Sequence, residues 1–140
     1  MLKKRNKFLF NFLLFVILIF LDQIIKIYIA SSNFDYTENR LYILGLFTLS
    51  KFLYLVLVLC VAVFLIRSIV LLKDNFLKNI YILLLSGIIS QSIDRLRQGY
   101  VIDYINLFDI TIINLADLYI VIGVAILINY FIIKNRLNYK

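Results

Sequence analysis

The sequence contains no histidine and no proline, and it has only one cysteine and four glycines. Without histidine, the chain cannot form a Ser-His-Asp or Cys-His catalytic group, or a His-ligated metal site, from its own residues. Cys60 has no second cysteine to pair with, so an internal disulfide is excluded. Its place within an apolar segment predicts a small buried hydrophobic residue. Because helix breakers are scarce, segment boundaries must be found from charge and hydropathy.

Hydrophobic residues make up 64% of the 140 positions, and the mean hydropathy is +0.98. Soluble domains of this size are about half apolar, and here the excess is arranged in long runs. The composition therefore predicts an integral membrane protein. The length suits a single helical domain over residues 1–140, with no room for a separate soluble domain.

The formal net charge is +7, which in another setting would suggest nucleic-acid binding. The basic residues instead cluster at the ends of the apolar segments: Lys3, Lys4, Arg5 and Lys7; Lys73 and Lys78; Lys134, Arg136 and Lys140. This distribution is typical of topology signals and of contacts with anionic lipid. No basic patch is interleaved with exposed aromatics, so we expect no nucleic-acid partner.

Four apolar segments have the roughly 20 residues that a bilayer crossing needs. The predicted spans are 8–30, 52–72, 79–96 and 112–133. The first resembles a secretory signal peptide, but it is too long and carries Asp22 and Lys26 where a cleavage site would be expected. Basic flanks on one side predict an all-α membrane protein with both termini in the cytoplasm and with segments 31–51 and 97–111 outside.

Four of the eight acidic residues lie between Ser86 and Ile120: Asp94, Asp103, Asp109 and Asp117. Asp117 stands within an apolar segment, where a carboxylate is costly unless it faces protein or water and has a function. At about 1.5 Å per helical residue, Asp22, Asp94 and Asp117 reach similar depths in the outer third of the bilayer. Three carboxylates at one level predict a polar pocket that opens outward.

Several kinds of chemistry are possible for these residues. Two neighbouring carboxylates in an apolar site share a proton, so that one activates water while the other polarises a carbonyl. A Ser-Lys pair of Lys26 with Ser31 or Ser32 is the weaker hydrolytic alternative. Asp22 and Lys26, four residues apart, can form an ion pair that either supports a pocket or only neutralises both charges. Asp94-Arg95 taken alone is most simply a solvated helix end, and Asp103 an ordinary loop acid.

At these residues the chain resembles the lipoprotein signal peptidase family, the type II signal peptidases. The family has D-x-x-x-K in its first helix, as at Asp22 and Lys26, and an N-x-G-x-A-F-G element against which E-N-R-L-Y-I-L-G-L-F aligns. Its G-G-x-x-G-N-x-x-D-R and G-Y-V-x-D-[FY] motifs correspond to S-G-I-I-S-Q-S-I-D-R and G-Y-V-I-D-Y. Its F-N-x-A-D motif corresponds to I-N-L-A-D. The resemblance extends over nearly the whole chain, and the combined spacing makes it specific.

The resemblance implies a membrane aspartic endopeptidase that removes signal peptides from prolipoproteins before a diacylglyceryl-modified cysteine. It implies Asp103 and Asp117 as the catalytic residues. The supporting positions would be Asp22, Lys26, Asn39, Asp94, Arg95 and Asn114. No metal or other cofactor is expected. The partners would be lipid-modified precursors and membrane lipid.

The same resemblance implies a monomer in the bacterial cytoplasmic membrane, with the active site toward the outer face. It also implies a small β-structured cradle there, which fits the strand-like segments 36–48 and 100–113.

Some positions depart from the family pattern. Ser86 and Ser90 replace glycines, Gln91 replaces asparagine, and larger or different side chains stand at Leu41, Ile43 and Leu44. These changes leave a catalytically inactive relative as an alternative. A small membrane carrier or proton-relay protein is another, because membrane Asp and Lys residues also line transport paths. Such a carrier would spread its carboxylates through the bilayer depth, whereas the inner half here lacks them. A purely structural four-helix protein does not explain Asp117.

Overall fold

A computed structural model of the chain describes residues 2–40 and 51–138, and the side chains of residues 6–40 and 51–136. Within these residues it contains four helices, each long and apolar enough to cross a membrane. The helices are α1 (Leu2–Ser31), α2 (Lys51–Leu71), α3 (Asn75–Arg97) and α4 (Leu115–Asn138). The predicted class, a mostly helical membrane protein with four spans and a small β-structured part, is confirmed.

Three of the helices begin several residues away from the starts of the predicted spans, and the first, α1, starts at Leu2 and not at residue 8. The third helix begins at Asn75, four residues before the predicted boundary, because the Asp74 carboxylate accepts a hydrogen bond from Phe76 N (2.8 Å) and caps the first turn. The fourth begins at Leu115 and not at residue 112, because Thr111–Ile113 form a strand. The β-branched, apolar residues before Asn114 suit either structure, and pairing with another strand decides between them.

Four short strands form two separate two-stranded antiparallel sheets. Strand β1 (Thr37–Asn39) pairs with β2 (Val101–Asp103), and β3 (Ile105–Leu107) pairs with β4 (Thr111–Ile113). The predicted β segments are confirmed at these positions, although residues 41–48 of the first segment lie outside the described residues. The β1–β2 pair brings Asn39 of the first connection beside Asp103 of the third.

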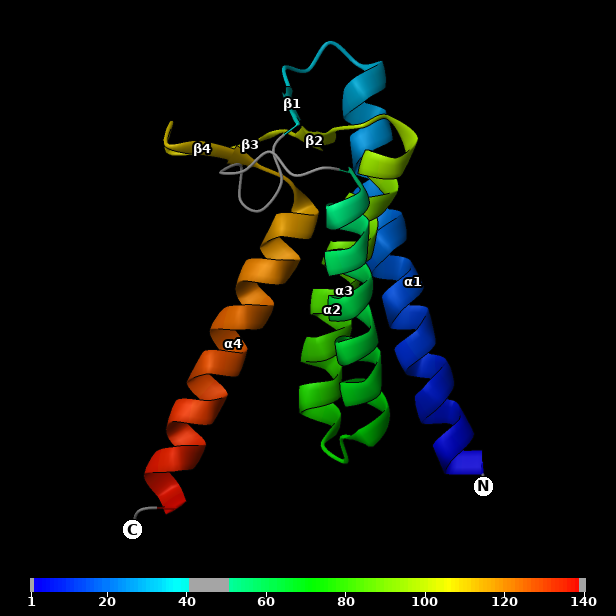
Figure 1. The fold of residues 1–140 in the computed structure, drawn as a ribbon, viewed down its shortest axis with the longest axis vertical. Coiled ribbons are helices and arrows are strands. Elements are labelled where there is room, and N and C mark those ends of the chain that lie inside the picture. The colour runs from blue at the N-terminus through cyan, green and yellow to red at the C-terminus, as the bar shows by residue number, and fades with distance from the viewer. Residues whose placement is uncertain (1, 41–50, 139–140) are drawn as a thin grey trace.

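Figure 1 shows the two chain ends and the α2–α3 connection at one end of the helices, and all four strands at the other. If all four helices cross a membrane, both termini lie on the same side of it, and the side that the basic flanks predict remains a prediction. In the same view, α4 leaves the strand-bearing end beside the other helices and diverges from them toward the C-terminus (Figure 1). The polar residues discussed below therefore gather where the helices meet.

Helix α3 is the central helix and packs against α1, α2 and α4. A small apolar core joins Ala62 and Leu65 of α2 with Leu84 and Leu85 of α3. At Gly87, a Cβ atom would lie 2.7 Å from the carbonyl oxygen of Ala116, so only glycine permits this close approach of α3 and α4.

The outward faces of α1, α2 and α4 are apolar and exposed, as expected for helices that contact lipid. Cys60 lies on such a face of α2 and is exposed, so the prediction of a buried residue is wrong. Hydropathy alone does not distinguish an apolar side chain that faces lipid from one that faces protein.

Candidate active site

A buried ion network joins α1 and α3. The Lys26 ammonium lies 2.7 Å from Asp22 Oδ2 and 2.6 Å from Asp94 Oδ2, and all three side chains are fully buried. The predicted Asp22–Lys26 ion pair is confirmed. The interpretation of Asp94-Arg95 as a solvated helix end is wrong, because Asp94 is 0% and Arg95 8% exposed. Packing of α1 against α3 covers this end of the helix.

Neutral donors complete the network around the two carboxylates. Ser90 Oγ donates to Asp22 Oδ2 (2.6 Å), and Gln23 Nε2 donates to Asp94 Oδ1 (2.8 Å). The other oxygen of Asp22 accepts from the backbone N–H of Ala116 (2.9 Å), which belongs to the first turn of α4. This bond satisfies one of the free N–H groups of a helix start. The network thus ties α1 and α3 to the beginning of α4.

Asp117 is held by a reciprocal cap at the start of α4. The Asn114 side-chain oxygen accepts from Asp117 N (3.0 Å), and Asp117 Oδ2 accepts from Asn114 N (3.1 Å). This is the geometry of a capping box, with Asn114 as the N-cap and Asp117 three residues later. The cap fixes the direction of the Asp117 carboxylate. The group that holds the carboxylate is the backbone N–H of Asn114, not the side-chain amide of Asn114.

Asp103 lies at the end of β2 and is 2% exposed. Its two carboxylate oxygens accept from Asn114 Nδ2 (2.5 Å) and from Asn39 Nδ2 (2.9 Å). Burial raises the pKa of the Asp103 carboxyl above its ordinary value, the two amide donors lower it by less, and the charge of Asp117 raises it further. Asp103 is therefore suited to hold a proton at a pH where an exposed aspartate would have lost it.

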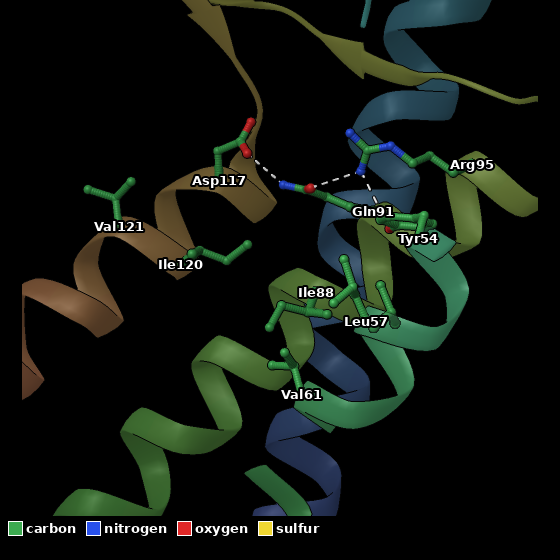
Figure 2. A pocket seen from close by; sticks show the side chains of 10 residues that line it. Tyr54, Leu57, Val61, Ile88, Gln91, Arg95, Asp117, Ile120 and Val121 are labelled. Atoms are coloured by element: carbon green, nitrogen blue, oxygen red, sulfur yellow. Dashed lines mark hydrogen bonds between the residues drawn. The ribbon is translucent and has the colours of Figure 1, made fainter. Parts of the chain in front are cut away.

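A polar chain reaches Asp117 from the other side. Gln91 Nε2 donates to Asp117 Oδ1 (2.5 Å), and Gln91 Oε1 accepts from the Arg95 guanidinium (3.2 Å). Arg95 in turn lies over the Tyr54 ring, 5.1 Å from its centroid, and approaches the Tyr54 hydroxyl (3.5 Å). Figure 2 shows this chain running from α2 and α3 toward Asp117 on α4. The arrangement places a cation one side chain behind the Asp117 carboxylate.

Asp117, Gln91 and Arg95 also line a cavity of about 380 Å³ between α2, α3 and α4 (Figure 2). The remaining wall is mainly apolar and consists of Tyr54, Leu57, Val58, Val61, Ile88, Ile120 and Val121. The polar groups lie toward the strand-bearing end, and the aliphatic side chains lie deeper along the helices (Figure 2). A substrate with an apolar segment next to a polar bond fits this division.

The eight site residues predicted from the sequence come together at one end of the molecule. They are Asp22, Lys26, Asn39, Asp94, Arg95, Asp103, Asn114 and Asp117. The prediction that Asp22, Asp94 and Asp117 lie near one another is confirmed, because Lys26 joins Asp22 to Asp94 and Asp22 bonds to the residue before Asp117. Asp22 and Asp94 are fully buried, however, and of the three only Asp117 lines the cavity described above. The Ser-Lys alternative is wrong: Lys26 is held by two carboxylates, while Ser31 and Ser32 donate to carbonyls of their own helix end.

Four further polar residues belong to the site: Gln23, Tyr54, Ser90 and Gln91. Two signals in the sequence could have indicated parts of this arrangement. The N-x-x-D spacing from Asn114 to Asp117 is that of a helix cap, and Gln91 lies one turn before Arg95. Tyr54 gives no local signal, because its role depends on how α2 packs. Among the described residues, no group of three or more acidic or cysteine side chains is arranged to hold a metal ion.

Comparison with known proteins places this geometry in a family. Residues 14–133 match the family model described as "Signal peptidase (SPase) II". A lipoprotein signal peptidase of Caldanaerobacter subterraneus subsp. tengcongensis is 33% identical over 132 residues, covering 82% of this chain and 90% of the relative. That of Clostridioides difficile is 30% identical over 138 residues, covering 84% of this chain and 91% of the relative.

Solved structures share the fold. One, described as a bacterial membrane enzyme at 2.3 Å resolution, has a TM-score of 0.77 and 26% identity, and the match covers 93% of this chain and 91% of the other. A second, at 1.9 Å resolution, has a TM-score of 0.75 with 21% identity over 86% of this chain and 91% of the other, and it supports the fold alone.

Proposed function

Because this chain belongs to the signal peptidase II family, we propose that Asp103 and Asp117 form its catalytic dyad. The enzyme is an aspartic protease of the lipoprotein signal peptidase type, and it removes signal peptides from prolipoproteins. The carrier and purely structural alternatives are therefore set aside.

The observation that carries the proposed dyad is the bridge made by Asn114. Its side-chain amide donates to Asp103, while its side-chain oxygen and backbone N–H bond to the main chain and the carboxylate of Asp117. One residue thus holds two carboxyl groups, from a strand and a helix, in a fixed mutual position. Pre-organised geometry of this kind is what a dyad that shares a proton requires.

The surroundings favour different roles for the two carboxyls. Asp117 accepts a hydrogen bond from Gln91, whose side-chain oxygen in turn accepts from the Arg95 guanidinium. Asp103 bonds to the neutral amides of Asn39 and Asn114, and burial raises its pKa. We therefore assign the general base to Asp117 and the proton donor to Asp103, within a pair that titrates as a unit.

In the proposed reaction, Asp117 takes a proton from a water molecule while the oxygen of that water attacks the scissile carbonyl carbon. Asp103 gives its proton to the carbonyl oxygen, so a neutral tetrahedral intermediate forms. When the carbon–nitrogen bond breaks, the leaving amine takes the proton from Asp117 and the intermediate returns a proton to Asp103. The dyad ends in its starting state, and the reaction needs no cofactor.

The substrate proposed for this site is a precursor cleaved before a diacylglyceryl-modified cysteine. The aliphatic wall of the cavity, with Leu57, Val61 and Ile120, suits acyl chains or an apolar signal peptide beside the polar end that holds Asp117. A membrane-embedded substrate can reach such a wall without leaving the bilayer. We also propose a monomer, because the residues of the site described above all come from one chain.

The departures from the family pattern are compatible with activity. Gln91, although one methylene longer than asparagine, still reaches Asp117 Oδ1, and the Ser90 hydroxyl is bonded to Asp22. Leu41, Ile43 and Leu44 lie outside the described residues. We therefore propose an active enzyme, not an inactive relative.

A cleavage assay on a lipidated prolipoprotein with the purified, membrane-reconstituted enzyme tests the dyad directly. Asp103→Asn and Asp117→Asn should each lose turnover while they insert and fold as the wild type does. Asp35→Asn, at an exposed acid of the α1–β1 connection, is the matched control and should retain turnover. Near-normal cleavage by either dyad variant would overturn the assignment.

The membrane orientation needs a separate test. The protein is a multi-pass membrane protein, and we propose that it lies in the bacterial cytoplasmic membrane as a single domain, 1–140, with the strand-bearing end outside. The basic residues near both termini and in the α2–α3 connection support this side. Single cysteines introduced into a Cys60→Ala background should react from outside near Asp35 and not near Lys134. An externally accessible C-terminus would contradict the proposed orientation.

A further inference from the structure

The β3–β4 hairpin ends in an unusually exposed apolar turn, which we define as the hairpin tip, Phe108–Ile110. Phe108 is 91% and Ile110 is 86% exposed, which are the highest exposures among the large hydrophobic residues described. Phe108 and Ile110 are separated by Asp109, which is also exposed. The tip belongs neither to the ion network nor to the proposed dyad. Large apolar side chains displayed in this way mark a contact surface.

The backbone of the tip is held in a conformation that its residues do not favour. Ile110 N donates to Leu107 O (3.0 Å), and the two residues between them have positive φ, 54° at Phe108 and 58° at Asp109. Turns of this kind normally have Asn-Gly or Asp-Gly at these positions. A bulky residue with positive φ is a true outlier, and such strain is found where the position has a function.

Asn106 stabilises this turn and holds the Asp109 side chain against the hairpin. Asn106 Nδ2 donates to Asp109 Oδ1 (2.6 Å), and Asn106 Oδ1 accepts from Asp109 N (2.8 Å). The carboxylate of Asp109 is thus folded back onto the hairpin. Phe108 and Ile110 remain as the outermost groups of a pre-formed, rigid turn.

The hairpin lies at the level where α4 enters the membrane. Strand β4 ends at Ile113, and the apolar span that begins at Leu115 follows after one residue. Figure 1 shows the hairpin running across the helix direction and projecting sideways beyond the start of α4, with no helix packed against its outer end. Because the hairpin runs across the helix direction, its tip is displaced sideways from the start of α4 and stays at the level of that helix end.

We propose that the hairpin tip is an interfacial lipid anchor, with Phe108 and Ile110 inserted between the lipid headgroups beside α4. A lipid surface is the occupant that this position supplies, because the tip projects sideways at the strand-bearing end of α4, whose exposed apolar residues begin below it at Val121. Aromatic and aliphatic groups on a rigid element at the boundary gain by leaving water, and the backbone there is already satisfied.

The anchor has a consequence for the active site, and this consequence rests on the proposed dyad. Strand β3 begins two residues after Asp103, and β4 ends one residue before Asn114. The hairpin therefore connects the two aspartates directly. Lipid contact at the tip holds both carboxyls at a fixed height relative to the headgroups, where the modified cysteine of a precursor is presented.

The absence of tryptophan from the chain allows a direct test with single-tryptophan variants in phosphatidylcholine bilayers. Phe108→Trp should show blue-shifted emission, strong quenching by lipids brominated near the headgroup end of their chains, and little quenching by aqueous iodide. Val124→Trp, at an exposed site within the α4 span, is the lipid control and should respond most to deeper bromines. Asp35→Trp, in the α1–β1 connection that lies farther out (Figure 1), is the water control.

A tip that is quenched by iodide and insensitive to brominated lipid, like the water control, would overturn the proposal. Insensitivity to both quenchers would also overturn it, because a second copy or another protein segment would then cover the tip. The Phe108→Trp signal should persist when Asp103→Asn is added, so a failed dyad assignment would leave the lipid result standing. In the cleavage assay, the double variant Phe108→Ser with Ile110→Ser should lower turnover in bilayers more than in detergent micelles. The conservative variant Phe108→Leu, which keeps an apolar side chain, should retain the wild-type turnover in both. Equal turnover in both media would refute the link to the active site.

Discussion

Two groups of aspartates lie close together at the strand-bearing end of the enzyme, and they differ in their partners. Asp22 and Asp94 both contact the Lys26 ammonium, at 2.7 and 2.6 Å, with all three side chains 0% exposed. Asp103 and Asp117 contact amide and backbone N–H groups instead, and Gln91 links Asp117 to the Arg95 cation. Residues of one chemical type are thus placed in two electrostatic settings within one site.

The difference separates a structural role from a chemical one. Two carboxylates in direct contact with a buried cation hold the helices that carry them together, because removing either partner would leave an uncompensated buried charge. A carboxyl held by neutral amides keeps its position in either protonation state, so it can take up and release a proton. The ion network connects α1, α3 and α4, and the dyad that we propose as catalytic lies beside it.

The largest expected effect is on the dyad, where the comparison predicts a loss of activity without a loss of folding. Asp103→Asn and Asp117→Asn should each lower turnover by about 10²- to 10⁴-fold, the range for general acid–base groups. The double variant should be little worse than either single one, because the two residues act as a unit. Turnover and thermal unfolding measured on the same preparations would check both parts, and additive losses would argue against a shared proton.

In the ion network, by contrast, we expect substitutions to lower the stability of the fold. Lys26→Met leaves Asp22 and Asp94 buried without their cation, which costs about 3–5 kcal/mol when one partner of a buried pair is removed. The unfolding free energy, measured with denaturant in micelles, should fall accordingly. Lys73→Met, at an exposed lysine of the α2–α3 connection, is the control and should change little. An unchanged stability in Lys26→Met would remove the distinction between the two groups.

A smaller effect should follow at Gln91, which links Asp117 to Arg95. Gln91→Leu keeps the volume but removes the donor to Asp117 and the acceptor for Arg95. A hydrogen bond to a charged group contributes about 1.5–3 kcal/mol, so turnover should fall by roughly 10- to 100-fold. Gln91→Asn should keep part of the activity, because it keeps the amide. Equal losses in both variants would indicate that shape, not the hydrogen bond, positions Asp117.

The smallest effect should be a shift in pH dependence. Asn39 donates to Asp103 and lowers the pKa of that carboxyl, against the larger upward effect of burial. Asn39→Ala should therefore raise the pKa of Asp103 further. Because the proposed proton donor must be protonated, the alkaline limb of the activity profile should move to higher pH. If the acidic limb of kcat/KM moved to higher pH instead, and the alkaline limb stayed in place, Asp103 would act in its ionised form.

Much of the candidate site could be predicted because its residues stand in short motifs of fixed spacing. Asp103, Asn114 and Asp117 were recognised from the G-Y-V-I-D-Y and I-N-L-A-D segments, and Asp22 and Lys26 from their separation of four residues. The polar contacts of Tyr54, Gln23 and Ser90 were not predicted. Each depends on a partner from another helix, such as Gln23 with Asp94 across 71 positions, and no local pattern records such a contact.

The sequence by itself determined the membrane class, the number of spans and the family, because these follow from hydropathy and local spacing. Only the tertiary structure decided that Asp94-Arg95 is buried, that residues 111–113 form a strand, and which aspartates contact a cation. The physical reason is that the protonation of a carboxyl depends on what surrounds it within a few ångströms. In this chain those surroundings are assembled from helices and strands that lie far apart in the sequence.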